Sequence, residues 1–156
     1  MRQRLLAIIV LLSCSLTAVL GQNNGDIIKY IQENKLYRNG NDVTVTNLDI
    51  EWPLELDGNG MGGLQGHLCK ALLDEDAKDM QTGWTSFHKK LGKEIHHMPD
   101  SISRHYITAK LQLLWTVPDY YVSLYLKRQV TDGSGKEVSA TKEYLTYDMR
   151  NGKVLS

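Results

Sequence analysis

The stretch "HYITAKLQLLWTVPDYYVSLYLKRQV", residues 105–130, decides the fold. Apolar and polar residues alternate in both of its halves, which is the pattern of half-buried β-strands. When the two halves are folded on each other at Pro118-Asp119, apolar residues oppose one another. The expected pairs are Val117 with Tyr120, Trp115 with Val122, Leu113 with Leu124, and Leu111 with Leu126. The stretch therefore predicts an antiparallel hairpin with one core-facing side.

Two other segments are predicted as strands. Residues 48–56 alternate in the same way, and Pro53 inside them predicts an edge strand or a bulge, because proline cannot donate to a sheet. Residues 143–149 precede Asn151-Gly152, a strong signal for a tight hairpin. Folding at that dipeptide pairs Met149 with Val154 and leaves the rest of the strand as an uncovered edge.

Three segments are predicted as helices. The first begins at Asp26, where Ile27, Ile28 and Ile31 would share a face. The second covers residues 64–73. The third covers residues 74–92, with acidic residues 74–76 at its start and Lys89 and Lys90 in its last turn. Together these elements predict an α+β fold, an antiparallel β-meander with helices packed on one face.

The N-terminus has the pattern of a secretory signal peptide. Arg2 and Arg4 precede an apolar run over residues 5–20, and Gly21 supplies a small residue before Gln22. We therefore expect a signal peptide at residues 1–21, a single domain at 22–156, and no membrane span after cleavage. The alternatives are an uncleaved anchor and a lipoprotein attached through Cys14 of "LLSC".

The composition of the mature chain excludes some functions. Without residues 1–21 it has 16 basic and 18 acidic residues and no basic stripe, so we expect no nucleic-acid partner. Only Cys69 remains, in "HLCKALL", and one cysteine cannot form an internal disulfide. It is interpreted as a small buried apolar residue.

Two motifs suggest a cofactor or a metal, each against a plainer interpretation. Gly58, Gly60 and Gly63 match a dinucleotide-binding spacing, but no βαβ unit follows, so they are interpreted as a mobile loop and no cofactor is expected. His96 and His97, with His105 nearby, are the best candidate metal ligands, against the interpretation as a solvated loop.

Tyrosines are the candidate binding residues. Tyr106, Tyr121 and Tyr125 fall on the face of the predicted hairpin that points away from the core. Such a face is either ordinary cross-strand packing or an amphipathic surface for a glycan or a protein.

The C-terminal segment "YLTYDMRNGKVLS" resembles the extracytoplasmic domain of RsiV-type anti-sigma factors and of certain peptidoglycan deacetylases. The matching residues are Tyr147, Asp148, Asn151, Gly152, Lys153, Val154 and Leu155, and the segments "LDIEWPLEL" at 48–56 and "YITAKLQLL" at 106–114 also correspond. The resemblance implies a non-catalytic α+β module outside the cytoplasm. In that family a further section follows the turn, so we expect a chain shortened at its C-terminus.

The expected function is that of an exported, non-catalytic binding domain of the bacterial cell envelope, secreted or periplasmic. Its partner would be a protein, a glycan, or a second copy joined through the C-terminal strand edge. The alternative is an envelope hydrolase or metal-dependent enzyme that uses the loop of His96, His97 and His105. No serine or acid pair stands in a recognisable catalytic setting.

Overall fold

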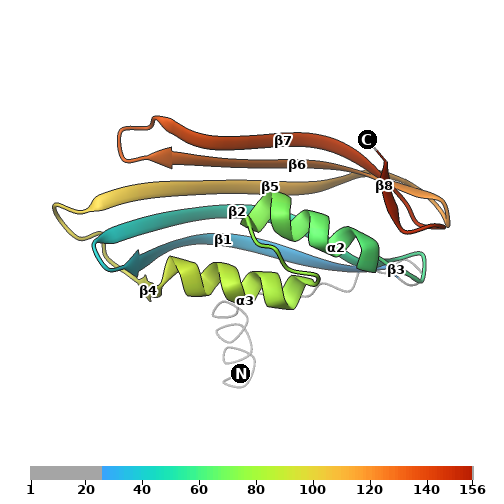
Figure 1. Ribbon diagram of the computed structural model, residues 1–156, viewed down its shortest axis with the longest axis horizontal. Coiled ribbons are helices and arrows are strands. Elements are labelled where there is room, and N and C mark those ends of the chain that lie inside the picture. The colour runs from blue at the N-terminus through green and yellow to red at the C-terminus, as the bar shows by residue number, and fades with distance from the viewer. Residues whose placement is uncertain (1–25, 156) are drawn as a thin grey trace, which may run out of the picture.

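The computed structural model describes residues 26–155, so the predicted signal peptide and Cys14 lie outside the described residues. One eight-stranded sheet dominates it, in the order β4-β1-β2-β5-β6-β7-β8, with β3 paired to β2 (Figure 1). The strands are β1 (Ile27–Asn39), β2 (Asp42–Leu56), β3 (Asn59–Gly60), β4 (Lys93–Ile95), β5 (Ser103–Val117), β6 (Tyr121–Asp132), β7 (Glu137–Asp148) and β8 (Lys153–Leu155). The helices are α2 (Gly62–Leu68), a π-helical turn η1 (Cys69–Leu73) and α3 (Met80–Leu91).

The fold is β-rich, and its sheet is mixed rather than a pure antiparallel meander. Strands β5 to β8 do form a meander, as expected. However, β2 and β5 run parallel, from Asp42↔Ser103 to Ile50↔Leu111. Two parallel neighbours cannot be joined by a tight turn, so the chain between them crosses back over the sheet. That crossover carries α2, η1 and α3.

The helices cover one face of the sheet, as predicted, and the core lies beneath them (Figure 1). Trp52 of β2 is fully buried, and its indole Nε1 donates to Oε1 of Gln65 on α2 at 2.6 Å. The Gln65 amide donates in turn to the Pro53 and Met61 carbonyls, so the buried polar atoms at this contact are paired. The core thus joins the crossover to the middle of the sheet.

The predicted helix after Asp26 is wrong, because the segment is strand β1. It pairs with β2 along its whole length and turns at Asn39-Gly40, where Gly40 has a φ of 62°. Ile31 and Tyr37 point into the core, and Glu33 lies between them on the same face. Because Glu33 puts a charge at a core position, the alternation of apolar and polar residues that marks a strand is interrupted in this segment.

Helix α3 begins later than predicted, at Met80. The carboxylate of Asp79 accepts a hydrogen bond from the Thr82 amide at 2.8 Å and caps the helix, whereas residues 74–76 precede it as irregular chain. Gly83 allows the close approach of η1, because a Cβ there would lie 2.6 Å from the Cys69 sulfur. The packing of the two helical segments therefore offsets the low helix propensity of this glycine.

The β5–β6 hairpin has the predicted register in its inner half and a different one near its turn. Leu111 faces Leu126 and Leu113 faces Leu124, as expected. A register shift between Leu113 and Trp115 then pairs Trp115 with Ser123, not with Val122. A one-residue shift moves the following side chains to the other face, so the assignment of Trp115 and Val117 to the core is wrong.

The segments around Gly58 and Pro53 bear on two further expectations. The glycine segment has regular structure: Asp57 and Gly58 have φ of 50° and 74° and form the turn between β2 and β3, and Gly63 already belongs to α2. The bulge expected at Pro53 is confirmed, because the β1–β2 register shifts beside it and β5 pairs with β2 only as far as Ile50.

The C-terminal hairpin forms, but with a longer loop than predicted. Tyr147 pairs with Val154 and Asp148 with Lys153, which leaves residues 149–152 as the loop. The Asp148 carboxylate accepts from the Arg150 amide at 2.9 Å and from the Asn151 side chain at 3.0 Å. These bonds stabilise a four-residue turn in place of the expected tight one.

Gly63 of α2 provides a test of how this hairpin docks on the helical layer. A Cβ at position 63 would lie 2.5 Å from the Gly152 carbonyl oxygen and 2.9 Å from the Tyr147 hydroxyl. We expect Gly63→Ala to lower the free energy of unfolding by about 1–3 kcal/mol, because the backbone of the turn must move. Gly60→Ala, whose Cβ would meet nothing within 4 Å, is the matched control and should cost less than about 0.5 kcal/mol. Urea unfolding of both variants measures the difference; equal losses would contradict this docking.

Candidate functional site

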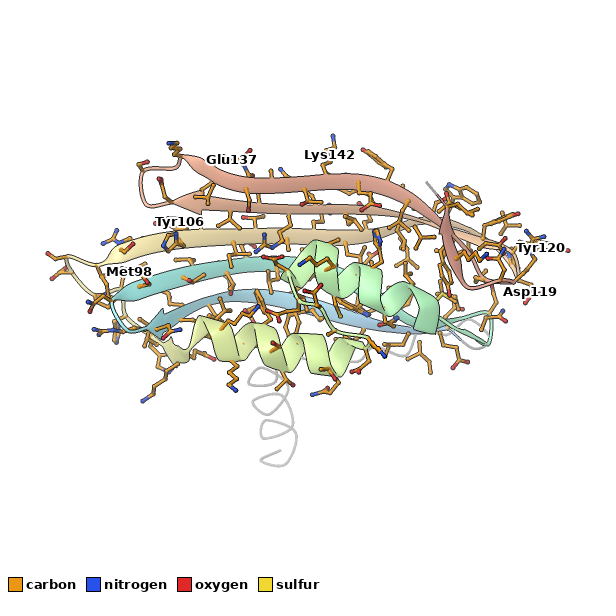
Figure 2. The ribbon with its side chains drawn as sticks, in the orientation of Figure 1. Met98, Tyr106, Asp119, Tyr120, Glu137 and Lys142 are labelled. Atoms are coloured by element: carbon orange, nitrogen blue, oxygen red, sulfur yellow. The ribbon has the colours of Figure 1, made fainter. Side chains whose placement is uncertain are left out.

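The sheet face opposite the helices is the main candidate surface, and we call it the open face. Side chains alternate cleanly across it: in β5, residues 107, 109 and 111 are buried under the helices, whereas 106, 108, 110 and 112 are exposed on the other side. Figure 2 shows α2 and α3 lying on the opposite face. The residues of the open face are therefore available to a ligand.

Four aromatic residues gather with Val117 on the open face towards the β5–β6 turn. We call this set the aromatic strip: Trp115, Val117, Tyr121, Tyr125 and Tyr144. Trp115 is 51% exposed, because the register shift after Leu113 turns it away from the core. The rings of Tyr125 and Tyr144 lie side by side, with centroids 4.9 Å apart. The strip thus combines flat apolar surfaces with phenol hydroxyl groups.

Arg150 closes the aromatic strip at its outer end. Its guanidinium carbon lies 4.9 Å from the centroid of the Tyr121 ring and 5.0 Å from that of Tyr120, within the range of cation–π attraction. The same side chain donates to the Tyr121 hydroxyl and forms an ion pair with Asp148 at 2.9 Å. Hydrogen bonds from Arg150 hold the pKa of the Asp148 carboxyl below its usual value, although burial opposes the shift. The carboxylate therefore fixes Arg150 over the tyrosines.

Next to the aromatic strip, three lysines face one another across three strands. Lys110 of β5 pairs with Lys127 of β6, which pairs with Lys142 of β7, and we call these residues the lysine row. Among residues 26–155, none of the three forms an ion pair with a carboxylate. Lys142 points away from the outer strand into solvent (Figure 2).

The structure brings together only some of the predicted tyrosines. Tyr121 and Tyr125 belong to the aromatic strip. Tyr106 lies on the open face too, but opposite Thr131, six residues along β5 from the residue that faces Tyr125. That separation is about 20 Å. Sequence reasoning missed Trp115, because the bulge was not visible, and Tyr144, because the register of β7 was ambiguous.

The three candidate metal ligands fall on two separate parts of the surface. His96 and His97 follow β4 and line a hollow with Arg38 and Glu94. His105 lies on β5 and lines a different hollow with Arg104 and Asp132. Within residues 26–155, no group of three or more histidines, cysteines and acids is arranged to hold a metal ion.

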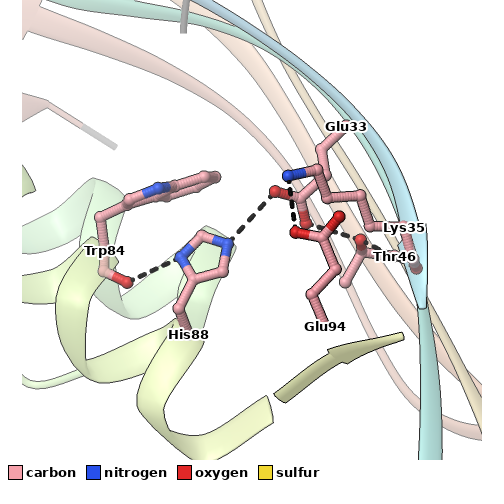
Figure 3. A network of polar contacts seen from close by, with 6 residues as sticks. All are labelled: Glu33, Lys35, Thr46, Trp84, His88 and Glu94. Carbon is pink, nitrogen blue, oxygen red and sulfur yellow. Dashed lines mark hydrogen bonds and ion pairs between the residues drawn. The ribbon is translucent and has the colours of Figure 1, made fainter. Parts of the chain in front are cut away.

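A buried polar network ties α3 to the sheet (Figure 3). Glu33 of β1 is 7% exposed; its carboxylate accepts from the Thr46 hydroxyl at 2.6 Å and contacts Nε2 of His88 at 3.2 Å. The other ring nitrogen of His88 lies 3.1 Å from the Trp84 carbonyl oxygen. Both ring nitrogens are thus engaged within the network. The network acts as a clamp between helix and sheet.

This clamp shifts the pKa values of the groups in it. Burial alone would raise the pKa of Glu33, but hydrogen bonds from His88 and Thr46 and the charge of His88 outweigh it, so the pKa is lowered. Burial and the Glu33 carboxylate raise the pKa of Tyr37. Elsewhere in the core, burial and then Asp79 and Glu75 raise the pKa of the Cys69 thiol to about 11, which makes it a poor nucleophile at neutral pH.

The lowered pKa of Glu33 predicts acid sensitivity. Its charge stabilises the fold above the unfolded-state value of about 4.5, and that contribution is lost as the pH falls through the lower folded-state value. In urea unfolding between pH 7 and pH 3, Glu33→Gln should flatten the acid side of the stability profile. Glu137→Gln, at an exposed strand end, controls for the loss of one negative charge. An identical acid slope in the Glu33→Gln variant and the unsubstituted chain would contradict the clamp.

Comparison with protein-family models, with curated proteins and with solved structures finds no match to the chain. Within residues 26–155, no helix has the length and apolar character needed to cross a membrane.

Proposed function

We propose that this chain is an exported, non-catalytic binding domain of the bacterial cell envelope, which holds a protein or glycan partner on the open face. The observation that carries the proposal is the register shift after Leu113. It places Trp115 and Val117 in solvent beside Tyr121 instead of in the core. Exposed apolar groups of this size cost solubility, and they are usually retained where they bind something.

The composition of the strip supports the proposal. Tryptophan, tyrosine and arginine dominate binding hot spots, and all three meet here in Trp115, Tyr121 and Arg150. The signal pattern of residues 1–21 and the resemblance of the segment around Tyr147 and Asp148 to extracytoplasmic domains support a place outside the cytoplasm.

Site-specific photo-crosslinking tests the binding proposal and export together. A benzophenone amino acid replaces Trp115 in the full chain, expressed in the bacterium that produces it. We expect a discrete crosslinked product with a protein or a glycan, and an N-terminus at or near Gln22 in the crosslinked chain.

Met98 is the matched control position. It is an exposed apolar residue at the opposite end of the sheet from Tyr120 (Figure 2). Equal products from positions 98 and 115, or none from 115, would exclude the aromatic strip as a binding surface. An intact Met1 in cytoplasmic material would exclude export.

The outer edge of β7 favours a second mode of association, in which a second copy or an extended peptide adds a strand. Among the described residues, β7 has β6 on one side, and β8 on the other side only at residues 146–148. The Met149 amide donates to the Tyr120 carbonyl. In an antiparallel ladder, the backbone groups of Ala140, Lys142 and Tyr144 therefore point away from β6. Such an edge is a template for a partner strand.

Hydrogen exchange tests this edge. In a dilute monomer, the amides of Ala140, Lys142 and Tyr144 should exchange quickly, whereas those of Glu143 and Leu145, which face β6, stay protected. Raising the protein concentration or adding a strand-forming partner should slow the first group. If every amide from Lys142 to Tyr147 is protected in the dilute monomer, the edge is already occupied and strand addition is wrong.

A further inference from the structure

The lysine row places three like charges directly opposite one another. Side chains in register on neighbouring strands lie about 5 Å apart, and like charges in such positions destabilise a sheet. Lys127 has a lysine on each side, because Lys110 and Lys142 are its two cross-strand partners. A single glutamate at position 127 would turn both repulsions into attractions. The row therefore costs stability that one substitution could restore.

One acidic residue, Asp49, lies in register with the end of the row on β2. Asp49 of β2 faces Lys110 in register, yet the two do not form an ion pair. Glu137 of β7 accepts a hydrogen bond from Gln129 instead. Lys142 and Lys110 are exposed, and Lys127 is half-buried between them. Among the described residues, Lys127 and Lys142 have no acidic residue opposite them on a neighbouring strand, so their ammonium groups are the more available to an anion from outside.

The aromatic strip begins one step along the same strands. Tyr125 and Tyr144 are two residues from Lys127 and Lys142, on the same face, so about 7 Å separates the two rows. The Lys142 ammonium lies 5.8 Å from the centre of the Tyr144 ring. A ligand that contacts the lysines would also lie against the phenol rings.

We propose that the lysine row and the Tyr125–Tyr144 pair bind an acidic polysaccharide, a linear glycan with one carboxylate on each sugar. The row offers one ammonium per strand, about 5 Å apart, to a chain that crosses the strands. The tyrosine rings offer flat amphipathic surfaces to the sugar faces. This inference rests on the proposed function, because it names the ligand of the same open face.

Titration of the purified exported chain with three probes tests the inference. Hexagalacturonate carries both the charges and the sugar faces, cellohexaose carries only the sugars, and inorganic polyphosphate carries only the charges. We expect hexagalacturonate to bind best, with an affinity that falls as salt is added. Each single lysine-to-glutamine change in the row should weaken it about threefold, and the triple change about thirtyfold.

Two variants make the result specific. Lys93→Gln, at an exposed position on β4 at the other edge of the sheet, should leave the affinity unchanged. Lys127→Glu should abolish binding while raising the melting temperature by about 3 °C at low salt, an increase that 1 M salt removes. Lost binding in a more stable protein cannot be attributed to misfolding.

Three outcomes would overturn the inference. Equal binding of cellohexaose that Trp115→Ala abolishes would leave the open face as a binding surface but exclude the role of charge. Polyphosphate binding as tight as that of hexagalacturonate, and unaffected by Tyr125→Ala, would exclude the sugar contacts. Absence of binding by all three probes would exclude the acidic-glycan ligand, whereas the crosslinking at position 115 decides the proposed function separately.

Discussion

The parallel pairing of β2 with β5 is the constraint on which the rest of this structure depends. Because both strands run in the same direction, the 46 residues between them must return along the sheet. They do so as α2, η1 and α3 on a single face, where Trp52, Gln65 and the Glu33–His88 contact fix them. One crossover can cover only one face. Within residues 26–155, the helices of the crossover therefore leave the open face without a helical layer.

Local sequence patterns predict this fold where each residue's partner lies nearby in the chain. The inner β5–β6 register and the C-terminal hairpin follow from local signals, although the hairpin has a longer loop than its turn dipeptide predicts. The turns at 39–40 and 57–58 are also local, but they were not recognised as hairpin turns. Strand β1 was missed because Glu33 occupies a core position. Its partners, Thr46 and His88, lie 13 and 55 residues away, and no local pattern reveals them.

The candidate site also depends on both local signals and long-range contacts, and the long-range contacts weigh more here. A bulge of one residue decides whether Trp115 is core or surface, and a contact with a distant part of the sequence lies beside it. The amide of Leu113 donates to the Glu51 carboxylate on β2 at 2.8 Å, immediately before the register shifts. The alternation of residues along β5 contains no sign of that contact. The alignment of Lys110 and Lys127 with Lys142 depends on the register of a third strand, which local alternation does not determine.

Charged side chains have different partners on the two faces of the sheet. On the helix side, buried or half-buried acids have basic partners: Glu33 contacts His88, Glu75 contacts Lys90 at 2.6 Å, and Glu143 contacts His67 at 3.0 Å. Two of these pairs join a helix to the sheet, and the Glu75–Lys90 pair joins the segment before α3 to that helix, so the cost of desolvation is offset by fixing the helical layer. On the open face, the lysine row joins three strands that backbone hydrogen bonds already hold, and its charges oppose that pairing. Folding therefore accounts for these three pairs of the covered face, whereas the alignment of the lysine row adds nothing to the pairing of its strands.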